Sequence, residues 1–173
     1  MLNVLIAYFS KDGENYVDGQ IVNLKQGNTE VVAQKIWQLT RGDAYKIETV
    51  KSYPDDYYAT TDVAKQEHET GETPDLKSPL PDVSKYDIII LGYPIWWDTF
   101  PAAVKSFLKS FDFTKKTILP FCTHEGSGLG RSERDLFDLC PKAEIKKGLS
   151  IYGHAVDNSD ESIRKWLSSN GLA

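Results

Sequence analysis

The sequence predicts an α/β protein in which helices cover both faces of a five-stranded, doubly wound parallel sheet. Short apolar runs alternate with segments of helical periodicity along the 173 residues. Strand–helix crossover units around a sheet buried on both faces produce this alternation. The first apolar run, residues 4–9, ends at Ser10 and reads as a buried strand.

Local patterns place five strands and the first two helices. The first helix follows Thr29 and carries apolar residues at helical spacing, and Gly42 comes after it as a stop signal. A weaker and more polar helix is expected over residues 55–69. The strands are expected at residues 2–9, 44–49, 86–92, 117–123 and 148–152.

Start and stop signals place the other three helices. The third begins with Pro101 in its first turn, where a residue without an N–H group is tolerated. Ser132 stands before two acidic residues and is expected to cap the fourth helix. The fifth helix is expected over residues 159–169.

Two connections are longer than the roughly 2–6 residues usual for such loops. Residues 11–28 separate the first strand from the first helix. Within them, apolar residues flank Asp18 and Gly19, a pair that favours a tight hairpin turn. The second stretch, residues 70–83, contains three prolines and is expected to cross the surface.

Length and composition narrow the classes of function. The length predicts one domain over residues 1–173, and no apolar run approaches the roughly 20 residues that cross a bilayer. A net charge of −5 argues against a nucleic-acid surface. Cys122 and Cys140 lack metal-ligand or redox-pair spacing, and no signal-peptide pattern is present, which favours the cytoplasm. No metal site is expected.

The loops that follow the first, third and fourth strands carry the candidate chemistry. In an open doubly wound sheet, ligands bind beyond the carboxyl ends of the strands. These loops are residues 10–29, 93–101 and 123–130, and they contain serine, paired tryptophans and several glycines. A hydroxylated loop leading into a helix start at Gly27 suits a phosphate, because N–H groups and the positive helix end meet there.

The motifs in these loops resemble those of the flavodoxin-like family along essentially the whole chain. Flavodoxins hold the FMN phosphate in a hydroxyl-rich loop that ends in Gly-Asn-Thr, as residues 27–29 do here. Residues 13–16, 92–97 and 122–128 are similar to motifs of the flavodoxin-type NAD(P)H-dependent FMN oxidoreductases. The resemblance implies a flavodoxin-like sheet of order 2-1-3-4-5 and FMN as cofactor. The interposed hairpin departs from the family pattern and splits the phosphate loop.

The resemblance and the loop positions together assign candidate site residues. His124 is a candidate catalytic group, because an unperturbed histidine titrates near pH 6.5. The expected FMN-binding residues are Ser10, Lys11, Asn15, Asn28, Thr29, Pro94, Ile95, Trp96, Trp97, Thr123, Glu125, Gly126, Ser127 and Gly128.

Structural roles remain open for several of these residues. Thr29 can cap a helix, and one of the two tryptophans can simply cover the sheet. His124 can bond its own loop backbone, and Glu125 can anchor that loop. Tyr57, in the second helix, is more typical of packing than of a substrate wall.

Two functions follow from the resemblance. The first is an oxidoreductase that passes electrons from NAD(P)H through FMN to a quinone or a similar small acceptor. The alternative is a flavodoxin that carries electrons between redox proteins. Carriers commonly shield both flavin faces with aromatic residues, and the fourth-strand loop has no Tyr or Trp. This absence favours the enzyme. A homodimer is compatible with either function.

Other classes fit less well. A phosphorelay receiver needs acidic residues after the first strand, where this chain has Phe9 and Ser10. A nucleoside-triphosphate hydrolase needs a lysine before the hydroxyl residue of the phosphate loop, and Asn28 stands at that position. A flavoprotein that acts only as a binding partner stays open, because fold does not fix function.

Overall fold

A parallel sheet forms the centre of the computed structural model, which describes residues 1–173. Its strands lie in the order β4-β1-β5-β6, and two short strands, β7 and β8, both pair with β6. The predicted order 2-1-3-4-5 is therefore confirmed. The strand bounds are β1 Val4–Tyr8, β4 Asp43–Lys46, β5 Ile88–Pro94, β6 Thr117–His124, β7 Glu144–Ile145 and β8 Leu149–Tyr152.

The fifth predicted strand is divided into two pieces. Ile145 pairs with Ile118, and Leu149 pairs with Phe121. Between these two pairs the chain advances by four residues from β7 to β8, but by only three residues along β6. An extra residue on one side of a ladder is the mark of a bulge. Gly148 lies in this interval, and a Cβ there would stand 3.2 Å from the Pro120 carbonyl oxygen.

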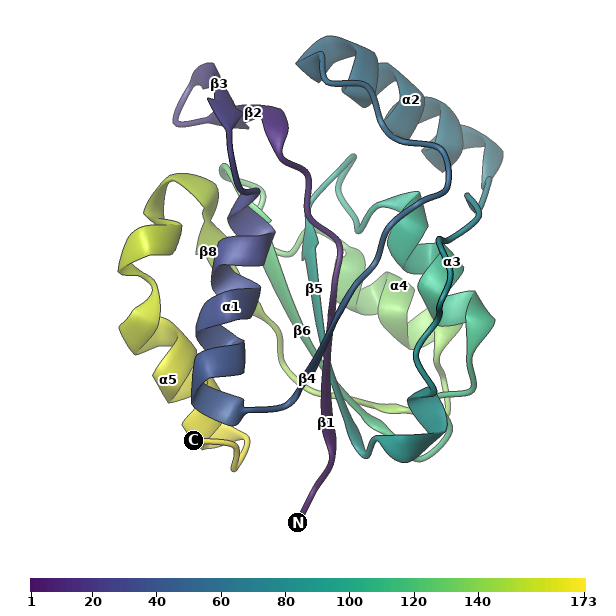
Figure 1. The fold of residues 1–173 in the computed structure, drawn as a ribbon, viewed down its shortest axis with the longest axis vertical. Helices are drawn as coiled ribbons and strands as arrows, with labels where there is room; N and C mark the ends of the chain where they lie inside the picture. Colours follow the sequence, from purple (N-terminus) through teal and green to yellow (C-terminus); the bar gives the residue numbers. More distant parts are fainter.

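Helices cover both faces of the sheet, as predicted. In Figure 1, α1 and α5 lie together on one face, α3 and α4 cover the other, and α2 projects above α3 beyond the carboxyl ends of the strands. No helix is both long enough and apolar enough to span a membrane. The helix bounds are α1 Asn28–Thr40, α2 Tyr57–Thr70, α3 Ala102–Ser110, α4 Ser132–Leu139 and α5 Asp160–Ser169, with short 3₁₀ helices at Val83–Lys85 and Gly153–Asn158.

The alternation of side chains along the strands produces two cores. Leu5 and Leu91 belong to the core beneath α3 and α4. Ile6 and Ile90, their neighbours in sequence, belong to the core beneath α1 and α5. All four side chains are at most 1% exposed, as expected for central strands of a parallel sheet.

Three helix boundaries differ from the sequence expectation. Arg41, with φ of 56°, takes the left-handed position that ends α1, while Gly42 is needed for space because a Cβ there would lie 2.8 Å from the Val4 carbonyl oxygen. Pro101 immediately precedes α3 rather than lying within it. Ser132 is the first residue of α4, and its hydroxyl donates to the Leu129 carbonyl instead of capping the helix.

The predicted hairpin is confirmed as an antiparallel pair, β2 Gly13–Val17 and β3 Gln20–Leu24. Asp18 and Gly19 have φ values of 49° and 81°, the positive angles that a two-residue hairpin turn requires. Figure 1 shows the hairpin at the carboxyl end of the sheet, the same end as α2. The hairpin and α2 therefore both lie beside the candidate site.

Candidate functional site

The loops after β1, β5 and β6 are joined at the carboxyl edge of the sheet. The Ile95 N–H donates to the Thr123 carbonyl at 3.0 Å, which ties the loop after β5 to the end of β6. The hydroxyls of Thr29 and Thr123 are 2.8 Å apart and almost completely buried. This bond ties the first turn of α1 to the same point. Pro94 lies opposite Thr123 in the β5–β6 ladder.

The first turn of α1 has the geometry of an anion-binding cradle. The first backbone hydrogen bond of α1 runs from the Val31 N–H to the Gly27 carbonyl, and the Glu30 N–H donates to Ser10 Oγ at 3.1 Å. The N–H groups of Asn28 and Thr29 precede these and have no intrahelical acceptor. With the positive end of the helix dipole, they suit a phosphate.

The cradle requires glycine at its base. A Cβ on Gly27 would lie 2.2 Å from Ser10 Oγ and 2.6 Å from the Lys11 carbonyl oxygen. The backbone of the β1 loop therefore approaches α1 as closely as it does only because residue 27 has no side chain. The donor set and this close approach fit the phosphate of FMN.

Ser10 and Thr29 differ in what their hydroxyls offer. The Thr29 hydroxyl is engaged by Thr123 and is 2% exposed as a residue. Ser10 Oγ only accepts a bond, from Glu30, so its proton remains available for a phosphate oxygen. Of the two hydroxyls, only that of Ser10 has a proton free for a ligand, whereas Thr29 has its backbone N–H to offer.

Lys11 and Asn15 hold the hairpin to the β1 loop. Asn15 Nδ2 donates to the carbonyls of Lys11 and Gly13, at 2.9 and 3.1 Å. Lys11 Nζ donates to the carbonyls of Asp12 and Glu14. Burial lowers the pKa of Lys11, and nearby carboxylates oppose that shift. These bonds from Lys11 and Asn15 thus hold the hairpin in place where it interrupts the loop between β1 and α1.

The two tryptophans after β5 have different environments. Trp96 is half-buried and packs edge-on against Phe9 and Tyr53, with ring centroids 5.3 and 5.2 Å away. Trp97 is 47% exposed, has a left-handed φ of 51°, and donates from Nε1 to the Thr61 carbonyl of α2 at 3.1 Å. Both line one cleft of about 350 Å³, so the structure brings the pair together at a cavity.

His124 bonds the backbone of its own loop. Its Nδ1 accepts from the N–H groups of Gly126 and Gly128, at 2.9 and 3.1 Å. Nδ1 is therefore unprotonated and the neutral ring carries its proton on Nε2. Burial lowers the pKa of His124, which favours that neutral form. The two glycine N–H groups are used by the histidine, whereas Ser127 between them is exposed.

Glu125 anchors the loop to the segment after β8. Its carboxylate accepts from the His154 N–H at 2.9 Å and lies 2.8 Å from His154 Nδ1. The sequence does not reveal this pairing, because 29 residues separate Glu125 from His154. Tyr152 was also missed, and its ring stands 4.5 Å from that of His124 and 5.0 Å from that of His154. An aromatic side chain from β8 thus borders the loop that has none of its own.

The start of α2 is a further part of the site that the sequence did not assign. Tyr57 and Tyr58 line the same cleft as the tryptophans. The Tyr57 N–H donates to Glu14 Oε2 at 2.7 Å, and its ring lies 6.2 Å from that of Tyr16. The two adjacent tyrosines at the start of a helix were the one sequence feature that could have indicated this part of the site. Nothing in the local pattern connected them to the hairpin.

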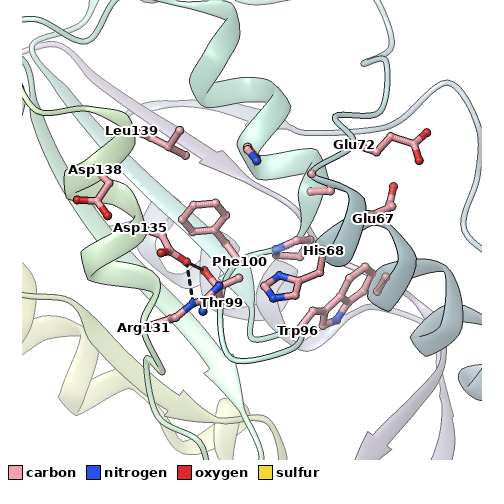
Figure 2. A pocket seen from close by; sticks show the side chains of 15 residues that line it. Glu67, His68, Glu72, Trp96, Thr99, Phe100, Arg131, Asp135, Asp138 and Leu139 are labelled. Carbon is pink, nitrogen blue, oxygen red and sulfur yellow. Dashed lines mark hydrogen bonds and ion pairs between the residues drawn. The ribbon is translucent and has the colours of Figure 1, made fainter.

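A second cavity, of about 290 Å³, lies between α2, the start of α3 and α4. Figure 2 shows His68 and Trp96 on the α2 side and Arg131 and Asp135 on the α4 side. Arg131 Nε donates to Asp135 at 3.3 Å, so its charge is already paired. Trp96 lines both cavities and separates the two regions.

The fold and the cradle define a class of protein, the α/β redox proteins that hold a flavin nucleotide at the carboxyl edge of a parallel sheet. The family model described as flavodoxin matches residues 3–170. This chain belongs to the flavodoxin family. The match confirms the family and the cofactor, FMN, that the sequence motifs predicted.

Solved structures with the same fold span nearly the whole chain. A presumed flavoprotein from Bacteroides eggerthii is 26% identical with a TM-score of 0.80, and the match covers 100% of both chains. A flavoprotein from Lactobacillus acidophilus in complex with FMN is 18% identical with a TM-score of 0.69, covering 96% of this chain and 99% of the other. A presumed quinone reductase from Klebsiella pneumoniae is 13% identical with a TM-score of 0.54, covering 98% and 85%. No curated protein sequence gives a significant match.

We expect His124 and His154 to titrate on opposite sides of the ordinary histidine pKa of about 6.5. Burial lowers the pKa of His124, whereas the hydrogen bond that the His154 ring donates to the Glu125 carboxylate raises the pKa of His154. Because the Glu125 carboxylate raises both values, Glu125→Gln should lower the pKa of each ring. Proton NMR of the histidine ring signals against pH measures both, with Glu69→Gln on the exposed side of α2 as the control.

The direction of these shifts fixes their effect on stability. A raised pKa at His154 stabilises the fold in full below pH 6.5, and the contribution is lost as pH rises through the folded pKa. Finding that both rings titrate together, or that Glu125→Gln leaves His154 unmoved, would contradict the described bonds.

Proposed function

We propose that the protein is an FMN-dependent oxidoreductase that passes electrons from NAD(P)H to a quinone or a similar small acceptor. The observation that carries the proposal is the cradle at the start of α1, which combines free N–H groups, the Ser10 hydroxyl and the close approach at Gly27. FMN, when bound, supplies the electron-transfer chemistry. The protein supplies binding, orientation and a restricted approach for the reactants.

The residues of the three loops would hold different parts of the cofactor. Ser10 and the N–H groups of Asn28 and Thr29 suit the phosphate. The aromatic and backbone groups of the β5 and β6 loops suit the flat ring system, where ring contacts add roughly 0.5–1.5 kcal/mol beyond burial. The proposed contacts from these loops come from Pro94, Ile95, Trp96, Trp97, Thr123, Glu125, Gly126, Ser127 and Gly128.

His124 is proposed as a hydrogen-bond donor to the bound cofactor or reactant. Its Nδ1 is occupied by two N–H groups, so the only exchangeable ring proton is on Nε2. Its lowered pKa keeps the ring neutral near pH 7. The role of His124 is therefore to hold a proton at Nε2 with a fixed ring orientation.

An electron-carrying flavodoxin is the alternative, and one observation favours it. Tyr152 stands beside His124 and is 46% exposed, which supplies an aromatic shield from β8 that the sequence did not reveal. Against it, the cleft between α2 and Trp97 leaves space for a reactant. We give the cleft more weight, because a carrier has no need of a second small-molecule cavity.

Replacing Ser10 tests the proposed phosphate site. Loss of a charge-assisted hydrogen bond costs roughly 1.5–3 kcal/mol, so Ser10→Ala should weaken FMN binding about 10- to 100-fold. Riboflavin, which lacks the phosphate, should lose much less. Calorimetric titration of both ligands into the apoprotein gives the comparison, with Ser169→Ala on α5 as a matched control. An equal loss for FMN and riboflavin would remove the phosphate from this loop.

Reduction of the bound flavin tests the choice between enzyme and carrier. Rapid mixing of the FMN-loaded protein with NADH or NADPH in the absence of oxygen should bleach the flavin absorbance. Subsequent addition of a quinone should restore it. If neither nucleotide bleaches a protein that has demonstrably bound FMN, the oxidoreductase proposal fails and the carrier replaces it.

A further inference from the structure

The cleft between α2 and the β5 loop has the size and lining of a small-molecule site. Its volume of about 350 Å³ lies within the range of roughly 300–1,000 Å³ that is usual for ligand pockets. Aromatic side chains come from α2 and from the β5 loop, and Glu14 and Asn15 of the hairpin complete the lining. The residues that carry the argument are Lys11, Tyr57, Tyr58, Trp96 and Trp97.

Two hydrogen bonds join the walls of the cleft to one another. Glu14, on the hairpin, accepts from the Tyr57 N–H at 2.7 Å and so fastens the hairpin to the start of α2. On the other side, Trp97 Nε1 donates to the Thr61 carbonyl at 3.1 Å. Hairpin, helix and tryptophan loop therefore form one preorganised frame, which reduces the entropy lost when a ligand binds.

The backbone at Trp97 supports a role in binding. Trp97 and Asp98 have φ values of 51° and 69°, a left-handed conformation that is rare for a bulky residue. This turn leaves the Trp97 ring 47% exposed at the cleft, while Trp96 packs on the core side. Sparsely populated backbone conformations gather at ligand sites, where the surrounding structure holds them in place.

The charges around the cleft disfavour an anion. Lys11 is the only cation in its lining, and its Nζ already donates to two backbone carbonyls. Lys65 stands 5.6 Å from the Trp97 ring centroid and faces Glu69 at 3.9 Å. The carboxylates that act on Lys11 are those of Asp12, Glu14, Asp55 and Asp56.

We propose that this cleft is the acceptor site and that it selects planar, uncharged aromatic molecules of the quinone class, which lie against Tyr57 and Trp97. The proposal rests on the proposed oxidoreductase function. Stacking on these rings supplies the binding energy, and the surrounding carboxylates repel acceptors that carry a sulfonate or carboxylate. The hairpin thus acts on specificity, because Glu14 and Asp12 belong to it or border it.

A binding titration that needs no turnover tests the proposal. 2-Methyl-1,4-naphthoquinone and 1,4-naphthoquinone-2-sulfonate would each be titrated, by ligand-observed NMR, into the apoprotein and the FMN-loaded protein. The neutral quinone should bind both forms at least tenfold more tightly than the sulfonate. Tyr57→Ala keeps the backbone N–H that binds Glu14 and should weaken the neutral quinone at least fivefold. Phe137→Ala, at an exposed aromatic on α4, is the control.

Removing the carboxylate charges near Lys11 provides a second test of the proposal. Asp12→Asn combined with Asp55→Asn should raise the affinity for the sulfonate severalfold and leave the neutral quinone unchanged. Equal affinity for the two quinones, or no effect of Tyr57→Ala, would overturn the proposal. Displacement of the quinone by FMN would also overturn it, because the cleft would then be the flavin slot. Failure of the apoprotein to bind FMN contradicts the proposed function instead, and is recorded separately from quinone binding.

Discussion

The buried hydrogen bond between the hydroxyls of Thr29 and Thr123 is the contact on which the site geometry depends. It fixes the first turn of α1 against the carboxyl end of β6, although β5 lies between β6 and β1, the strand that precedes α1 in the sheet region. The Ile95 N–H bonds the same residue of β6 through its carbonyl. Three loops therefore share one anchor at the carboxyl end of β6. A site built on strand ends and a helix start holds its donors more accurately than one built on loops alone.

The hairpin changes the usual relation between the first loop and the cofactor. It lengthens the loop after β1, yet Asn15 and Lys11 bond the backbone at its base, so that Ser10 and Gly27 still meet. Its far side reaches α2 through Glu14. One insertion thus leaves the start of α1 unchanged and contributes a wall to the cleft beside α2.

The fold was predictable because its signals are local, whereas much of the site was not. Continuous apolar runs reveal buried strands, and Asp18-Gly19 reveals the hairpin, since both depend on near neighbours. The partners of Glu125 and the position of Tyr152 depend on β8 lying beside β6, a contact between residues about 30 positions apart. Gly148, at the bulge, lies close to the Pro120 carbonyl, a long-range contact that no periodicity in the sequence indicates. The motif of residues 27–29 located the cradle, but only packing revealed that the Thr29 hydroxyl is occupied.

The central claim is that the start of α1 receives the phosphate of FMN. Amide chemical-shift mapping of ¹⁵N-labelled protein, with FMN and with riboflavin, tests it most directly. FMN should shift the N–H signals of Asn28, Thr29 and Glu30 strongly, whereas riboflavin should leave these three nearly unchanged while still shifting signals of the β5 and β6 loops. Identical shifts at the α1 start for both ligands, or FMN shifts confined to the α2 cleft, would contradict the account.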